Sequence, residues 1–161
     1  MASHPYISGA GNVAQMIKQL RSKFPGTVTS ETVKKLGIAP NNESYVINAL
    51  QFLGIIDEEG KKTDKGGEVL AIHKEEDFRK GFEALVRDAY MDLFELHGDK
   101  VWELDGDDLV NYFRKSDKTS AAIGQRQAKV FQTFAALAGH GEIESKAPAT
   151  GTKKAKPTKA L

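Results

Sequence analysis

The sequence predicts a mainly α-helical protein made of two winged-helix or helix-turn-helix-like units, packed around a long central helix and carrying a small β-wing. Three observations predict this fold. Residues 29–70 follow the order helix, turn, helix, short apolar strand, polar turn and helix start. Residues 75–96 carry apolar side chains at helical spacing throughout. Residues 105–139 repeat the order of short helix, polar turn, longer helix and glycine stop, in pattern and not in residue identity.

The first predicted element is a helix over residues 12–24, in which apolar side chains recur three and four apart. Its apolar face consists of Val13, Met16, Ile17, Leu20 and Phe24. Asn12 is expected to cap this helix, because its side-chain oxygen can accept a hydrogen bond from an early helical N–H group. The Pro25-Gly26 pair should end it.

The next two predicted helices form the first helix-turn-helix. Ser30 is expected to cap a short helix that ends at Gly37, a residue that tolerates the left-handed conformation. After a turn at Pro40, a second helix is expected over residues 42–53, with Gly54 as its stop. Its buried stripe is predicted to be Val46, Ile47, Leu50 and Leu53.

A wing follows this second helix. Ile55 and Ile56 read as a short strand, and residues 57–62 as the wing turn. Thr63 should cap a new helix, because an acidic residue, Asp64, follows it in the first turn.

In the second half of the chain, one uninterrupted helix is expected over residues 75–96. The apolar insert around Trp102 is compatible with either a strand or an extended connector. Asp105 and Asp108 have the spacing of a capping pair for a short helix. Either Thr119 or Ser120 is expected to cap the last helix, which should end at Gly139.

Three regions are therefore predicted: a first unit (1–74), the long helix with the second unit (75–144), and a Lys-rich tail or linker (145–161). The tail has too few apolar residues to offset the entropy of ordering, so we expect it to be disordered. The 161-residue chain has no cysteine, no membrane-length apolar run and no secretory signal. These features favour a cytoplasmic protein without a membrane partner.

Charge is unevenly distributed along the chain. Residues 75–108 contain 4 basic and 12 acidic side chains, whereas the tail contains five lysines and no acid. An acidic central segment between more basic ends predicts two functional surfaces of different charge.

Several stretches resemble a bacterial and phage-associated family of domains of unknown function, numbered 5343. The resemblance covers residues 5–142. It is carried by 5–7 (PYI), 53–57 (LGIID) with Gly60 and Thr63, 85–90 (LVRDAY) with Leu93 and Phe94, and Phe131 with 133–138 (TFAALA). It implies a winged-helix-like fold and no established activity, so no catalytic or binding residue follows from it.

No catalytic, metal or cofactor site is predicted. The four histidines are far apart at no ligand spacing, and each lies beside a helix end or a terminus. There it is expected either to interact as a cation with the helix dipole or to be solvated. The acidic run at Asp105, Asp107 and Asp108 lacks calcium-loop spacing, so helix capping explains it. No nucleophile has a base partner in a known motif, and no small-molecule substrate is evident. We therefore expect a non-enzymatic protein without a cofactor.

The predicted function is binding of nucleic acid, in the form of duplex DNA, because helix-turn-helix units place their second helix in the major groove. The candidate binding residues of the second unit are Arg114, Lys115, Lys118, Gln125, Arg126 and Lys129. The wing region adds Lys61, Lys62 and Lys65, and the Lys-rich tail at 145–161 is expected to add a sequence-independent attraction to DNA. The presumptive recognition helix of the first unit contains no Lys or Arg, although Asn42, Asn48 and Gln51 could read adenine edges.

The alternative function is a protein-interaction or self-association module of winged-helix type that does not bind DNA. Tyr45, Phe52 and Trp102 would be its anchors if they were exposed. The acidic residues 75–108 would then face a basic partner. The target, the oligomeric state and the pathway are not encoded in any local pattern of this sequence.

Overall fold

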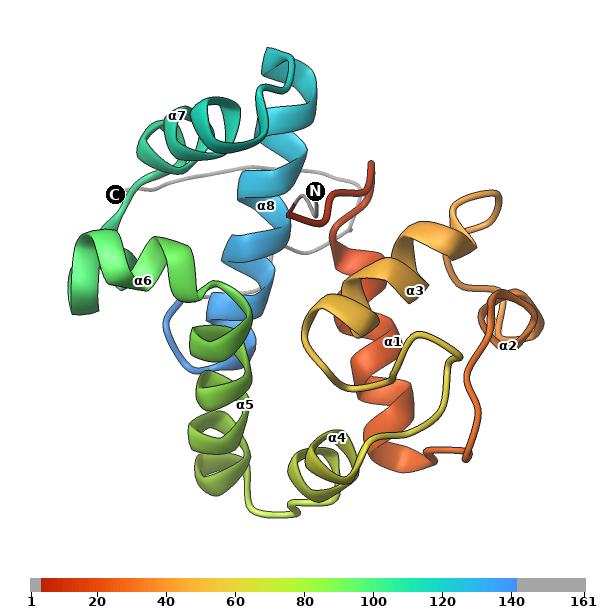
Figure 1. Cartoon of the computed structure of the whole chain (residues 1–161). Coiled ribbons are helices and arrows are strands. Elements are labelled where there is room, and N and C mark those ends of the chain that lie inside the picture. The colour runs from red at the N-terminus through yellow and green to blue at the C-terminus, as the bar shows by residue number, and fades with distance from the viewer. Residues whose placement is uncertain (1–3, 142–161) are drawn as a thin grey trace, which may run out of the picture.

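The structure is a computed structural model that describes residues 4–141. The predicted tail at 145–161 lies outside these residues. Within the described part, the chain forms eight α-helices and one 3-10 helix (Figure 1). They are α1 (Gly11–Ser22), α2 (Ser30–Lys35), α3 (Glu43–Phe52), α4 (Asp64–Leu70), α5 (Glu75–Ala89), α6 (Met91–His97), η1 (Gly98–Glu103), α7 (Gly106–Asp117) and α8 (Ala121–Leu137). None of the described helices is long and apolar enough to cross a membrane.

The first half of the chain, α1–α4, forms one side of the molecule, and the predicted caps need two corrections there. Helix α1 begins at Gly11, so Asn12 lies inside its first turn, where its N–H donates to the Gly9 carbonyl at 3.0 Å. Thr29, and not Ser30, is the extended residue before α2, and its N–H donates to Oγ1 of Thr32 at 3.1 Å. Thr63 caps α4 as predicted, accepting from the Gly66 N–H at 2.9 Å.

The predicted β-wing is not confirmed. The polar turn is flanked by isolated β-bridges, and the described residues contain no β-strand. Ile56 pairs antiparallel with Lys62, and Thr27 pairs antiparallel with Lys61. One carboxylate oxygen of Asp57 accepts from the backbone N–H groups of Glu59 (2.9 Å) and Lys61 (2.8 Å), which holds the turn closed.

The long helix predicted over residues 75–96 is interrupted at Tyr90, which leaves helical geometry with φ −103° and ψ 34°. Its ring is fully buried. The ring centroid lies 4.9 Å from the ring centroid of Phe52 and 4.8 Å from that of Phe131. The break allows one aromatic side chain to contact both halves of the protein. After α6, the insert around Trp102 is the 3-10 helix η1, and neither a strand nor an extended connector.

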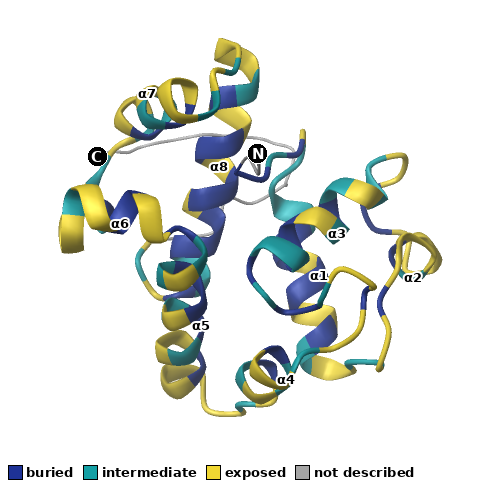
Figure 2. Cartoon of the chain, viewed as in Figure 1, coloured by how far each residue is buried: buried dark blue, intermediate teal, exposed yellow. Residues whose placement is uncertain are grey.

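The central element is α8, which packs against α1, α5 and α7 (Figure 1). Figure 2 shows it buried along the part that lies between the two halves. Buried residues of both halves belong to one hydrophobic cluster.

Candidate nucleic-acid interface

Helices α7 and α8 form a hairpin with a three-residue connection, residues 118–120. Lys118 makes the reversal with a left-handed backbone, φ 56° and ψ 47°. Ser120 caps α8, because its hydroxyl accepts from the Ile123 N–H at 3.2 Å, whereas the Thr119 hydroxyl donates to Gln127 Oε1. Gly124 allows the close approach of the helices, since a Cβ there would lie 2.6 Å from Cγ of Arg114.

One side of α8 is buried and the other forms an exposed stripe. The buried positions toward its N-terminal end include Gly124, Gln127 and Ala128. The stripe consists of Ala122, Gln125, Arg126, Lys129 and Gln132, all exposed. Helix α8 contains no acidic residue. All six predicted binding residues of the second unit, Arg114, Lys115, Lys118, Gln125, Arg126 and Lys129, are exposed on α7, the connection or this stripe.

The only acid between residues 109 and 137, Asp117, is turned inward. Its side chain is 7% exposed, and its Oδ2 accepts from the His4 backbone N–H at 2.9 Å and from Gln127 Nε2 at 2.7 Å. Burial alone would raise the pKa of Asp117, but the hydrogen bonds from His4 and Gln127 outweigh burial and hold that pKa below its ordinary value. The exposed carboxylates of the hairpin are therefore confined to the first turn of α7, at Asp107 and Asp108.

His4 is buried, which corrects the expectation that it is solvated. Its Nδ1 lies 3.0 Å from Oδ2 of Asp117, and its Nε2 lies 2.8 Å from Oδ2 of Asp92. Tyr112 donates its phenol to the same Asp92 oxygen. This network joins the N-terminal segment to α6 and to α7. The sequence gives no spacing signal for it, because its members are distant along the chain.

The three wing-region lysines do not join the hairpin residues. Figure 1 shows the polar turn and α4 away from α7 and from the N-terminal end of α8. Lys62 donates to the Phe24 carbonyl at 3.3 Å and lies over the Phe24 ring. Lys65 pairs with Asp88 at 3.1 Å. Lys61 is exposed on the turn.

The presumptive recognition helix of the first unit, α3, is largely engaged within the protein. Gln51 donates to the carbonyls of Asp57 and Glu58 at 3.3 Å, and Asn42 donates to Ser8 Oγ at 3.4 Å. Asn48 is exposed. The N-terminal segment thus covers part of the surface that a groove-reading helix would need.

The aromatic anchors considered for a protein interface are also engaged. Tyr45, Phe52 and Trp102 are partly buried and pack against the hydrophobic core. The Trp102 ring stacks on His140 with centroids 3.9 Å apart, and His140 Nε2 lies 2.9 Å from Oε1 of Glu83. Burial opposes ionisation of Glu83, but contacts with His140 and Arg87 lower its pKa below the ordinary value.

No curated protein and no solved structure matches the chain. A family model matches residues 5–148, which is most of the sequence, and its description is "Family of unknown function (DUF5343)". The match includes α1–α8 and the exposed stripe. The resemblance that the sequence motifs indicated is thereby confirmed, and the chain belongs to this family of unknown function.

Proposed function

We propose that this chain is a non-enzymatic binding protein of winged-helix type that binds duplex DNA through the α7–α8 hairpin. The order of elements in the first half supports the winged-helix interpretation. Helix α1 is followed by the Thr27 bridge, by α2 and α3, and then by the Ile56 and Lys62 bridge that flanks the polar turn. Two bridges at these positions support this interpretation, because the small sheet of a winged helix occupies the same places in the chain order.

The observation that carries the DNA-binding proposal is the exposed α8 stripe. Asp117, the acid nearest to the α7–α8 connection, is turned inward, and the exposed acids of the hairpin, Asp107 and Asp108, lie at the far end of α7. Phosphate contacts supply much of the affinity of a DNA-binding protein, and a carboxylate on the same surface would repel them. Arg126 and Lys129 lie on the stripe, and Lys115 and Lys118 extend the positive surface onto α7 and the connection.

The N-terminal end of α8 is suited to entering a groove. Ala121 and Ala122 are small and exposed there, so the helix backbone can approach a ligand closely. Gln125 follows one turn later, and its amide can make paired hydrogen bonds to an adenine edge. Recognition helices characteristically contact bases with residues near their N-terminal ends. We assign the wing-region lysines a smaller contribution, because they lie away from this surface.

A fluorescence-anisotropy titration with mixed-sequence duplex DNA at low salt tests this proposal. We expect the wild-type protein to bind, and Arg126→Glu/Lys129→Glu to bind at least about tenfold more weakly. The slope of log K against log salt should fall in magnitude by about 2, as expected for the loss of two phosphate contacts. Lys18→Glu/Lys80→Glu is the matched control, because it makes the same charge change on exposed positions of α1 and α5.

Two results would overturn the assignment. The wild-type protein would show no binding at low salt, or the control would weaken binding as much as the hairpin variant. The second result would mean that net charge alone governs the attraction.

The alternative, a protein-interaction module, is supported by α6. Met91 is 52% exposed and Leu96 is 65% exposed on that helix, which belongs to the acidic stretch 75–108. Light scattering of the purified protein, with Leu96→Asp beside the wild type, tests self-association. A wild-type dimer that Leu96→Asp dissociates would favour this alternative. A monomeric wild-type protein would exclude self-association as its mode of interaction.

A further inference from the structure

A groove of about 780 Å³ lies between α1 and α2, beside the segment that connects them. Its apolar lining includes Met16 and Leu20 of α1 and Leu36 at the end of α2. Leu36 is 42% exposed, so a large apolar side chain at the border of the groove faces water. An apolar group bound there would be stabilised by the burial of this surface. Figure 1 shows α2 at the edge of the molecule away from α7, so the groove is separate from the α7–α8 hairpin.

The segment between α1 and α2 presents a free backbone edge beside this groove. Thr27 pairs antiparallel with Lys61. On one side of this pair, the Val28 N–H donates to the Gly60 carbonyl at 2.7 Å, and on the other side the Gly26 carbonyl accepts from the N–H that follows Lys61 at 2.9 Å. Thr27 is therefore in a non-hydrogen-bonded pair, and its own N–H and carbonyl point away from the polar turn. Neither group has a hydrogen-bond partner among the described residues, and Thr27 is exposed on the lining of the groove.

An unpaired backbone edge is a template on which another extended chain can pair. The length of the pairing is limited here. Pro25 has no N–H, and the Thr29 N–H already donates to Oγ1 of Thr32 at 3.1 Å. An added strand would therefore exchange two hydrogen bonds with Thr27 alone. Two bonds fix the register of a short peptide and leave most of its affinity to the side chains.

The charge on the lining of the groove favours an acidic ligand. Lys23, which follows α1, and Lys35, at the end of α2, are both exposed there. Neither ammonium group forms an ion pair or a hydrogen bond with another described residue. Glu31 is the one acid on the described lining, so the two lysines outnumber it. Carboxylates on a ligand would complement these two cations, whereas lysines on a ligand would be repelled.

We propose that this groove binds an extended peptide segment of a partner protein, in which apolar side chains are flanked by carboxylates. One peptide residue pairs with the free N–H and carbonyl of Thr27. Val28 is fully buried, so the peptide residues on either side of the paired one point to the same side as Val28, toward the apolar floor and Leu36. Carboxylates at the two ends of the peptide lie beside Lys23 and Lys35. This binding does not use the α7–α8 hairpin and goes beyond the proposed DNA-binding function.

The probe is a fluorescein-labelled, C-terminally amidated peptide of sequence EVTVE, titrated with the full chain and followed by fluorescence anisotropy. Two peptides with the same label serve as controls. KVTVK reverses the terminal charges, and EVTVE with an N-methylated threonine lacks the central backbone donor. We expect saturable binding of EVTVE at protein concentrations up to about 1 mM. KVTVK should bind at least about tenfold more weakly, and the N-methylated peptide at least about fivefold more weakly.

Variants of the protein test the location. Lys23→Glu/Lys35→Glu should weaken EVTVE binding at least about tenfold and should bind KVTVK more tightly than the wild type does. Lys18→Glu/Lys34→Glu is the matched control, because it makes the same charge change at exposed positions of α1 and α2 that do not line the groove. Thr27→Pro removes only the outward N–H, a change that a strand edge tolerates, and should weaken binding about fivefold. If this variant misfolds, the N-methylated peptide tests the same pairing from the other side.

The assignment is overturned if EVTVE shows no saturable binding, if KVTVK or the N-methylated peptide binds the wild type equally well, or if the control pair weakens binding as much as the groove pair. It is also overturned if the wild type self-associates in light scattering and Lys23→Glu/Lys35→Glu abolishes that association, because the occupant would then be a second copy of this chain. A failure of the protein to bind DNA would leave each of these results unaffected.

Discussion

Nδ1 of His4 lies 3.0 Å from Oδ2 of Asp117, although 113 positions separate the two residues in the sequence. This contact attaches the N-terminal segment to the end of α7 and directs the carboxylate of Asp117 inward. Gln127 strengthens it by donating to both the His4 carbonyl (3.1 Å) and Asp117 (2.7 Å). The contact thus stabilises the fold and keeps a negative charge away from the basic surface of the hairpin.

Asp117→Ala should lower the free energy of unfolding by about 3 kcal/mol, because it leaves buried groups of His4 and Gln127 without their acceptor. Urea denaturation followed by Trp102 fluorescence measures this change. Asp107→Ala is the matched control, since Asp107 is an exposed carboxylate on the same helix, and its loss should cost less than about 1 kcal/mol. Equal losses in the two variants would contradict a stabilising role for the buried network.

The stability of the protein should fall in acid because the pKa values of Asp117 and Glu83 are lowered in the folded state. A carboxylate with a lowered pKa contributes stability above its unfolded pKa of about 4, and that contribution is lost as the pH falls through the folded pKa. Urea midpoints measured between about pH 5 and pH 2 should therefore decrease. Asp117→Asn should show a shallower decrease than the wild type, and parallel curves would refute this assignment.

At alkaline pH, two tyrosines are expected to make the stability of the protein fall as the pH rises. Burial raises the pKa of Tyr90, as do the charges of Asp92 and Asp117, and burial with the hydrogen bond to Asp92 raises the pKa of Tyr112. Because the unfolded chain releases these protons near pH 10, stability should decrease as the pH rises above about 10. In an ultraviolet difference titration, Tyr90→Phe and Tyr112→Phe should leave the phenolate signal of the folded protein near pH 10 unchanged. A loss of signal in either variant would show that its tyrosine ionises in the folded protein.

Two adjacent glycines of α4 should respond oppositely to alanine. A Cβ at Gly66 would clash with the Ile55 carbonyl oxygen and lie 2.7 Å from the Ile55 Cα, so Gly66→Ala forces the helix away from the backbone that follows α3. We expect a loss of about 2–4 kcal/mol, typical of overpacking against backbone. A Cβ at Gly67 meets only the flexible Lys62 side chain at 3.4 Å, so Gly67→Ala should be neutral or stabilise by up to about 1 kcal/mol. Thermal unfolding of the pair measures the difference, and similar melting temperatures would refute the close contact at Ile55.

The sequence predicts features that depend on neighbouring residues. Helical periodicity indicates α1, α3 and α8, and cap chemistry correctly selects Thr63 and the Asp105–Asp108 pair. The basic cluster of the hairpin can also be predicted from the sequence, because its residues lie close together in the chain.

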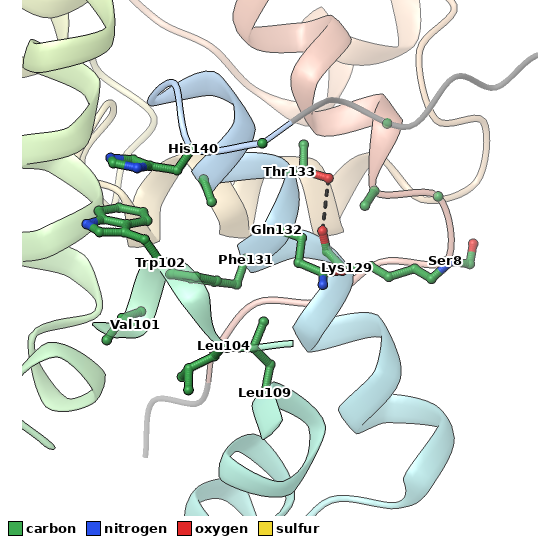
Figure 3. A pocket seen from close by; sticks show the side chains of 15 residues that line it. Ser8, Val101, Trp102, Leu104, Leu109, Lys129, Phe131, Gln132, Thr133 and His140 are labelled. Atoms are coloured by element: carbon green, nitrogen blue, oxygen red, sulfur yellow. Dashed lines mark hydrogen bonds between the residues drawn. The ribbon is translucent and has the colours of Figure 1, made fainter. Parts of the chain in front are cut away.

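Features that depend on tertiary contacts are not predictable in this way. The apolar period of residues 75–96 continues through Tyr90, so it cannot reveal a break that serves contacts with Phe52 and Phe131. The burial of His4 depends on carboxylates 88 and 113 residues away. A cavity of about 460 Å³ (Figure 3) likewise exists only because Gly11, Trp102 and His140 meet, and no local sequence pattern marks any of the three.

If the hairpin reads DNA, base discrimination should depend on Gln125 and not on the first unit. Gln125 and Asn48 are both exposed amides on helices that follow a turn, but Gln125 lies next to Arg126 on α8, whereas α3 contains no Lys or Arg. Selection from a random duplex library compares the wild type with Gln125→Ala and Asn48→Ala. Gln125→Ala should lose an adenine preference of about 1–3 kcal/mol at one position, and Asn48→Ala should retain the full consensus. A consensus altered by Asn48→Ala alone would instead assign base reading to α3, and it would require the N-terminal segment to leave that helix when DNA binds.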